Sequence, residues 1–503
     1  MSDNLHNSAC DDAYPADMGG PADVSSPSRR AFMRRSSQLA VTGTALPFAL
    51  NLAAMGEASA AVAGDYKALV CVFLYGGNDY GNTVVAYDEP SYDAYSAIRG
   101  GSGRAGGGCA LARAALAPTL LQPTTPLPDG RQYAFNPAMT ALAGLFNSGK
   151  AAVQLNVGPL IVPITKAQFN GADRKNYPLP AKLLSHSDQQ AVWQSSAAEG
   201  GATGWGGRIG DYAIASNGAA TFTCISATGN TVFLAGEQAM AYQLSPTGAV
   251  PYKAAKSTVY NSTAVKSTVA ALISQQRDHL MENEYNKMAV RSIGAEAQVN
   301  GALGTESTLS TPFPATGLGD QLKVVARMIA ARGSLGVKRQ VFFVSMSGFD
   351  LHAGLMTEHP DLLAAVSDAM AAFYNATVEL GVADQVTSFT ASDFGRTLAI
   401  NGSGVDHGWG SHHIMVGGAV KGKAFYGKAP AVTIGNTAAE ADQWHIGQGR
   451  LLPSTSVDQY AATFARWFGV PEAALTDILP NLKNFGAPAG RPDYPRDIGF
   501  MKT

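Results

Sequence analysis

The chain has 503 residues, of which 46% are hydrophobic and 15% charged, and its formal net charge is −2. This is the composition of a globular protein, long enough for one large α/β domain or two smaller ones. The near-neutral charge and the lack of a basic stripe in the sequence argue against nucleic acid as a partner.

The first 63 residues have the features of an export signal. Residues 1–27 are polar and rich in small side chains, and 28–32, Ser-Arg-Arg-Ala-Phe, resemble the twin-arginine signal. An apolar run interrupted by Pro47 and small-residue cleavage candidates at 58–63 follow. We therefore expect 1–63 to be a disordered N-terminus with a signal peptide that the twin-arginine export machinery recognises. Residues 64–503 are expected to form a single α/β domain with insertions, periplasmic or secreted, with no stable membrane span.

Three cysteines lie in the predicted mature chain. Cys71 falls within an apolar run and is expected in the core, whereas Cys109 and Cys224 could pair in an oxidising periplasm, which the sequence leaves open. The chain has no Cys-x-x-Cys and no dinucleotide-binding glycine pattern. These absences argue against cysteine-bound zinc and against a redox protein.

Continuous apolar runs predict strands that are buried on both faces of a mostly parallel sheet. The predicted strands are 67–74, 151–157, 341–345 and 386–390, with shorter ones at 221–225 and 231–234. Helical spacing predicts helices at 91–99, 136–147, 204–212, 320–331, 360–381 and 457–468, and a mostly helical stretch at 257–297. The alternation of strands and helices indicates βαβ units and an α/β fold with a doubly wound central sheet and helices on both faces.

Polar side chains follow three of the predicted strands. Asp79 comes after 67–74, Asp350 and His352 come after 341–345, and the strand 386–390 is followed by Asp393, Arg396 and His407. An open α/β sheet builds its site beyond the carboxyl ends of its strands. Carboxylates and imidazoles are typical ligands of zinc and similar divalent ions, so these residues predict a metal site. Arg396 could pair with Asp393 or bind phosphate or sulfate.

Some of these residues also have an ordinary structural interpretation. The segment Gly76–Thr83 can be a simple Asn/Asp/Gly turn. His412 and His413 are adjacent, so an extended chain would point them to opposite faces, and we expect a structural role for His413. For His186 the sequence leaves open a substrate loop or a Ser-capped helix start, whereas Asp188 is expected in the first turn of such a helix.

Several motifs together resemble the exported bacterial family DUF1501. They include LVCVFLYGGND, SHSDQQAVWQ, GWGGRIGD, VFFVSMSGFDLH, SDFGR and NGSGVDHGWGSHHIMVGG, and the resemblance covers about 67–468. That family is in turn similar to the alkaline phosphatase/sulfatase superfamily. The resemblance implies an alkaline phosphatase-like fold, which is a large doubly wound α/β sheet.

The superfamily resemblance also implies a divalent-metal cofactor such as zinc. Asp350, His352 and His407 match the ligands of one ion. Asp79 and Asp393 match ligands of a second ion.

The sequence departs from the superfamily pattern in one metal ligand and in the nucleophile. Phe394 stands where a histidine of the second metal site is expected, and the nucleophile is unclear, with Thr83 the nearest candidate and Ser185 and Ser187 behind it. The leading expectation is an exported, metal-dependent hydrolase of phosphate or sulfate esters, with Thr83 and Arg396 in catalytic roles. The alternative is a non-catalytic exported binding protein on a degenerate alkaline phosphatase-like fold.

Overall fold

The computed structural model describes residues 66–100, 108–197, 201–251, 258, 261–305 and 309–502. These residues belong to one compact unit that spans 55–503. The predicted export signal in 1–63 lies outside the described residues. Within them, no helix combines the length and the apolar character needed to cross a membrane.

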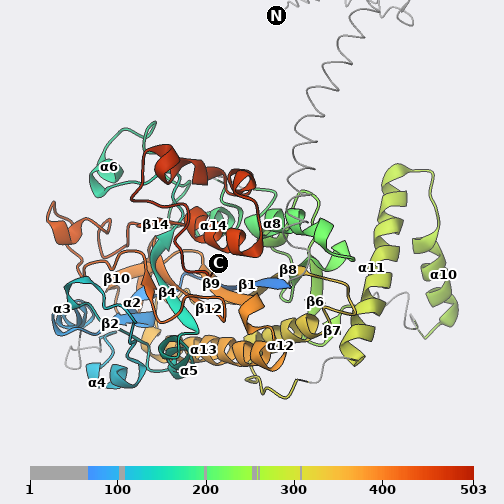
Figure 1. The fold of residues 1–503 in the computed structure, drawn as a ribbon, viewed down its shortest axis with the longest axis horizontal. Helices are drawn as coiled ribbons and strands as arrows, with labels where there is room; N and C mark the ends of the chain where they lie inside the picture. Colours follow the sequence, from blue (N-terminus) through green and yellow to red (C-terminus); the bar gives the residue numbers. More distant parts are fainter. Residues whose placement is uncertain are drawn as a thin grey trace, which may run out of the picture. The chain divides into compact units, whose positions relative to one another are not determined.

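Ten strands of the described chain form one sheet, in the order β13-β4-β12-β9-β1-β8-β5-β6-β7, with β14 beside β4 (Figure 1). Their bounds are β1 Lys67–Leu74, β4 Ala151–Gly158, β5 Cys224–Ser226, β6 Tyr242–Ser245, β7 Gly248–Ala249, β8 Arg339–Met346, β9 Val386–Ser392, β12 Ser411–Gly417, β13 Phe425–Tyr426 and β14 Thr455–Ser456. Strand β12 is antiparallel to β4 and β9, β7 is antiparallel to β6, and the other pairs are parallel. The predicted α/β class with a mostly parallel sheet is confirmed.

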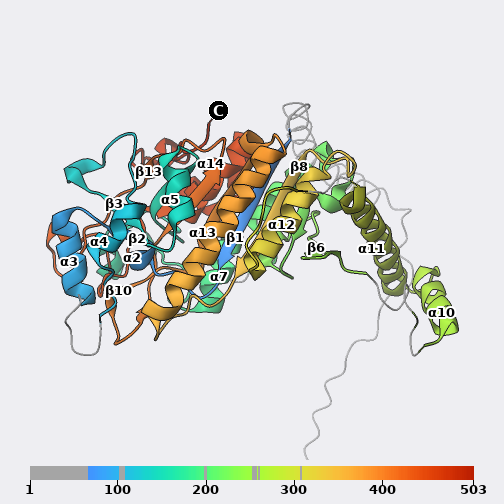
Figure 2. The same ribbon diagram turned by 90° about the horizontal axis from the view of Figure 1, so that it is seen from below.

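Helices cover both faces of this sheet. The helices are α3 Glu89–Arg99, α5 Thr140–Asn147, α7 His186–Ser195, α8 Trp205–Ala213, α10 Thr263–Ser274, α11 Leu280–Thr305, α12 Gly317–Ala330, α13 Leu355–Glu379 and α14 Val457–Phe468, with shorter ones at α2 Tyr80–Thr83, α4 Arg113–Leu116, α6 Lys166–Asn170 and α15 Leu475–Ile478. Figures 1 and 2 show α5, α12 and α13 on one side of the sheet and α8 and α14 on the other.

Strand β1 explains the two-sided core, because successive side chains of a strand point to opposite faces. Val70 and Val72 pack in the hydrophobic cluster that contains α5, α12 and α13. Cys71 and Phe73 pack in the cluster that contains α8 and α14. Each fully buried side chain of this size contributes roughly 1.5–3 kcal/mol, so both faces require apolar residues.

The predicted helix 136–147 was wrong at its start, because α5 begins only at Thr140. The Asn136 side chain accepts a hydrogen bond from the Ala138 backbone and donates to the Asn82 carbonyl. This Asx-type turn competes with the helix over the first four residues.

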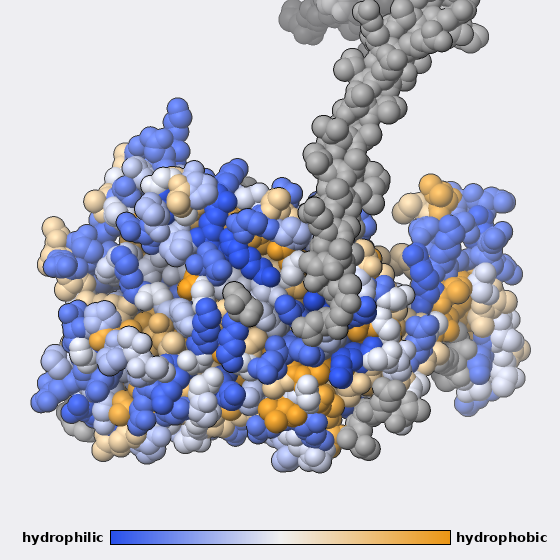
Figure 3. Space-filling view, viewed as in Figure 1, coloured by the Kyte–Doolittle hydropathy of each residue, from blue (hydrophilic) through white to orange (hydrophobic). Residues whose placement is uncertain are grey.

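Two predictions in the insertions were also wrong. Residues 232–234 form a 3₁₀ turn rather than a strand, because the Thr231 hydroxyl accepts from the Phe233 backbone. Helix α11 continues to Thr305, beyond the predicted helical stretch. Helices α10 and α11 pack on each other and keep exposed apolar side chains, which include Leu280, Met281, Tyr285 and Met288 (Figure 3).

The cysteines that the structure describes are free thiols. Cys224 is buried in the cluster of α8 and α14, whereas Cys109 is buried beside Leu351 and Val405. The pairing of Cys109 with Cys224, which the sequence leaves open, is therefore not formed.

We expect Asp458→Asn to stabilise the protein above neutral pH. Asp458 lies in the first turn of α14, and burial raises its pKa to about 6. Because the folded state holds this proton more tightly than the unfolded chain, stability falls as pH rises from the unfolded pKa through the folded pKa. Asparagine avoids the buried charge and retains an acceptor for the Asn481 backbone.

The gain should be about 2–3 kcal/mol at pH 8 and should vanish near pH 4, measured by urea unfolding. Asp93→Asn, at an exposed position of α3, is the control and should show no such pH-dependent gain. An equal gain at both pH values would contradict a buried, ionising Asp458.

Candidate metal centre

The candidate site lies beyond the carboxyl ends of the parallel strands β8 and β9. Asp350 and His352 lie in the turn between β8 and α13. Strands β10 Arg396–Ile400 and β11 Val405–His407 form an antiparallel hairpin after β9, in which Arg396 pairs with His407. The fourth segment is the start of α7, where His186 is the first helical residue.

Three imidazoles and one carboxylate converge. The Nε2 atoms of His186 and His352 each lie 3.0 Å from Nε2 of His407. Oxygens of Asp350 lie 3.3 Å from His186, 3.1 Å from His352 and 3.4 Å from His407. A tetrahedral zinc ion with bonds of 2.0–2.1 Å separates its ligand atoms by about 3.3–3.4 Å, so these spacings fit a common ion. Among the described residues, the group whose ligand atoms all lie within 4.8 Å of one another is His186, Asp350 and His407, with His352 beside it.

Each of the three rings has its other nitrogen beside an oxygen. His186 Nδ1 lies 2.7 Å from Asp393 Oδ2, His407 Nδ1 lies 2.7 Å from the Leu184 carbonyl, and His352 Nδ1 lies 3.3 Å from Asp406 Oδ1. An oxygen acceptor at Nδ1 keeps the ring proton there and leaves the lone pair on Nε2. The Nε2 atoms of the three rings therefore face one another and Asp350, as the donor atoms of a metal site would.

The charges around the carboxylate favour its ionised form. Burial alone would raise the pKa of Asp350, but the Arg396 guanidinium, 2.7 Å away, holds this pKa below its usual value. The hydrogen bond to Asp393 raises the pKa of His186. Burial lowers the pKa of His407, and Arg396 acts in the same direction. Asp350 and His352 keep 46% and 45% of their side chains exposed, so the centre is open to solvent.

Arg396 supports Asp350 rather than pairing with Asp393. Its side chain is fully buried, and Nη1 donates to Asp350 Oδ1 and to the Gly76 carbonyl at 3.0 Å. Nη2 donates to the Val405 carbonyl at 2.6 Å. The guanidinium thus ties the turn after β1 to the β10–β11 hairpin and fixes the carboxylate between them.

Asp393 orients His186 and is fully buried. Its Oδ2 accepts from the Gly76 backbone at 3.1 Å and from Gln190 Nε2 at 2.9 Å, in addition to His186. Phe394, next in the chain, packs its ring at a tilt against the rings of His186 and His407, with centroid distances of 4.7 and 4.8 Å.

Asp79 and Thr83 lie in a separate buried network. Asp79 caps α2 and forms a two-pronged ion pair with Arg99 of α3, at 2.5 and 2.7 Å. The Thr83 hydroxyl donates to the Asp79 carbonyl at 2.7 Å. The structure therefore brings Asp350, His352, Asp393, Arg396 and His407 together, and leaves Asp79 and Thr83 in the neighbouring network.

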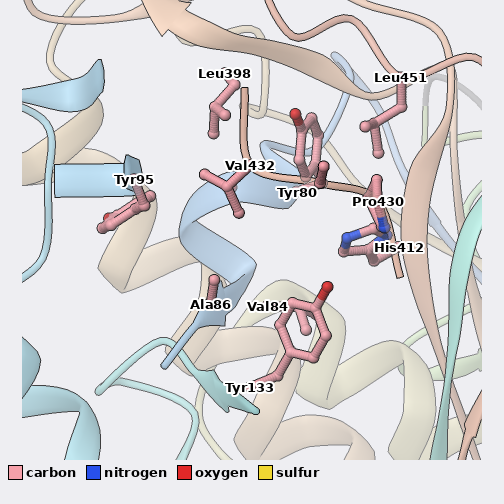
Figure 4. A pocket seen from close by; sticks show the side chains of 12 residues that line it. Tyr80, Val84, Ala86, Tyr95, Tyr133, Leu398, His412, Pro430, Val432 and Leu451 are labelled. Carbon is pink, nitrogen blue, oxygen red and sulfur yellow. The ribbon is translucent and has the colours of Figure 1, made fainter. Parts of the chain in front are cut away.

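His412 and His413 are buried in β12. His412 Nδ1 accepts from the Asn156 backbone at 3.0 Å, and the ring lines a small hollow with Tyr80 and Tyr133, apart from the metal centre (Figure 4). His413 lies beside the Thr390 hydroxyl at 3.2 Å. Burial lowers the pKa of both rings to about 3, so both are neutral.

The residue that sequence reasoning left out of the site is His186. The motif Ser185-His186-Ser187-Asp188 is a helix start, as one of the two interpretations predicts, but the Ser185 side chain does not cap it and its Oγ donates to Asp188 Oδ2 at 2.6 Å instead. His186 nevertheless turns into the centre. The signal that the sequence does contain is a histidine at the first position of a helix, directly after Ser185. The positive φ of 72° at Leu184, two residues earlier, is visible only in the structure.

Two solved structures give the comparison of folds. The crystal structure of Ps i-CgsB in complex with k-i-k-neocarrahexaose is 8% identical, with 82% of this chain and 74% of that chain covered and a TM-score of 0.31. The crystal structure of PsFucS1 sulfatase from Pseudoalteromonas sp. is 10% identical, with 86% and 72% covered and a TM-score of 0.29. No curated protein sequence matches this chain.

The family model described as "Protein of unknown function (DUF1501)" matches residues 66–479. The match includes every segment that contributes to the metal centre: the turn after β1, the start of α7, the turn after β8, and β9 to β11. The chain belongs to the DUF1501 family.

Proposed function

We propose that this protein is an exported, metal-dependent hydrolase of phosphate or sulfate esters. The observation that supports it best is the convergence of three imidazole Nε2 atoms on Asp350, with the Nδ1 atom of each ring beside an oxygen. Export rests on the sequence of residues 1–63, which the twin-arginine machinery would recognise.

The donor set fits a divalent ion of the zinc type. His186, His407 and Asp350 would hold it, with nitrogen and oxygen ligands that zinc commonly takes, and the fourth position, beside His352, would stay open to water or substrate. Asp393, Asp406 and the Leu184 carbonyl supply the outer partners that fix such rings. When bound, the ion would polarise an ester oxygen and lower the pKa of a water molecule.

The chain's own groups leave water as the nucleophile. The Thr83 hydroxyl is buried and bonded to the Asp79 carbonyl, and among the described residues no hydroxyl or thiol is in hydrogen-bond contact with the four converging side chains. Hydrolysis would add the water oxygen to phosphorus or sulfur, break the ester bond and release the alcohol. Arg396 would serve by holding Asp350 rather than by binding the substrate.

The same observation supports an alternative. A family member with no side-chain nucleophile, and with Phe394 packed on two of the imidazoles, could be a binding protein that uses the metal centre to hold an anionic ligand. It would retain the ion and lack turnover.

His407→Ala should abolish tight metal binding, because His407 Nε2 contacts both other imidazoles. The metal is first removed with a chelator, and the mature variant is then titrated with Zn²⁺. Its affinity should fall, relative to the native protein, by more than the roughly 10–100-fold that loss of an outer hydrogen-bond partner costs. His279→Ala, an exposed histidine before α11, is the control and should bind like the native protein. Equal affinities for the two variants would contradict the site.

Asp393→Asn should weaken Zn²⁺ binding roughly 10–100-fold while all the proposed ligands remain. The carboxylate holds the His186 ring by its Nδ1 atom at 2.7 Å, and an amide can donate to that nitrogen and favour the wrong tautomer. Calorimetric titration measures the loss, with Asp93→Asn as the matched control. Unchanged affinity in a folded Asp393→Asn protein would remove Asp393 from this role.

Zn²⁺-loaded mature protein should hydrolyse 4-nitrophenyl phosphate or 4-nitrophenyl sulfate. A chelator should abolish release of 4-nitrophenol and added Zn²⁺ should restore it, and His407→Ala should be inactive where His279→Ala is active. A protein that binds the ion tightly and turns over neither ester would reject the hydrolase in favour of the binding protein.

A further inference from the structure

The carboxylate at the end of the first strand already has a cation. Asp79 is buried, and both of its oxygens accept from Arg99, Oδ2 from Nη1 at 2.5 Å and Oδ1 from Nη2 at 2.7 Å. The backbone N–H groups of Gly81 and Asn82 occupy the same two oxygens from the other side, at 3.2 Å each. No lone pair of this carboxylate faces an open space.

The guanidinium is held as firmly as the carboxylate. Arg99 is fully buried, its Nε donates to the Leu398 carbonyl and its Nη2 to the Thr397 carbonyl, both at 3.1 Å. Gly81 makes room for it, because a Cβ at that position would lie 2.6 Å from Nη2. Removal of Arg99 from Asp79 would leave two buried charges unpaired, which is costly.

The remaining carboxylate offers little to a second ion. Asp393 Oδ2 has three donors, and only Oδ1 lacks a partner. The next side chain is the Phe394 ring, which offers no ligand atom. One oxygen is far fewer than the four ligands that a structural or catalytic zinc site needs.

We propose that the protein binds a single metal ion per chain. The Arg99 guanidinium occupies the Asp79 carboxylate, which a second ion would otherwise use. This inference rests on the proposed function, because it presumes an ion at His186, Asp350 and His407. It deepens that function by assigning the catalytic charge to one ion.

The test is the number of ions per chain. Mature protein is stripped with a chelator, loaded with excess Zn²⁺, freed of unbound metal by gel filtration and analysed by inductively coupled plasma mass spectrometry. We expect one ion per native chain and fewer in His407→Ala. Two ions per native chain would overturn the single-ion inference and leave the proposed function intact, whereas none would reject both.

A double variant tests Arg99 and Asp79 directly. Asp79→Asn/Arg99→Gln removes both buried charges together, so no unpaired charge remains, and it should still bind one ion. A folded double variant, judged by circular dichroism, that has lost its ion would overturn the inference, because Asp79 would then be a ligand. If the double variant does not fold, anomalous scattering at the zinc edge from native crystals decides: one peak at His407 supports the inference and a second at Asp79 overturns it.

Discussion

The candidate metal centre depends on the backbone of Gly76. Its N–H donates to Asp393, which orients His186, and its carbonyl accepts from Arg396, which holds Asp350. One residue thus connects two of the converging side chains to strand β1. Gly76 has a φ of 116°, and a Cβ there would collide with the Asp350 backbone, so only glycine allows this approach.

The centre is assembled from segments far apart in the sequence. His186 begins α7, Asp350 and His352 follow β8, and His407 ends β11. An ion held by all of them would link these segments, so binding and local stability would be coupled. The strands supply the rigidity for this assembly, because β1 is fully buried between β8 and β9 beyond its first residue.

Much of the framework could be predicted, because buried strands are continuous apolar runs. β1 and α14 have the predicted bounds. Asp350 and His352 follow β8, and His407 ends the β10–β11 hairpin that follows β9, so all three lie beyond the carboxyl ends of neighbouring strands. The pairing of Asp79 with Arg99 could not be predicted, since it depends on how α3 docks. The place of His186 in the site could not be predicted either. Sequence periodicity does not say where the start of α7 lies relative to β9, which comes much later in the chain.

The position of the Phe394 ring depends on the glycine at position 77. A Cβ on Gly77 would lie 2.5 Å from the Phe394 ring, and Gly77 has a φ of 83°, so the aromatic ring occupies space that only glycine leaves free. A side chain at position 77 would therefore force the Phe394 ring to move, and with it the packing of that ring on His186 and His407.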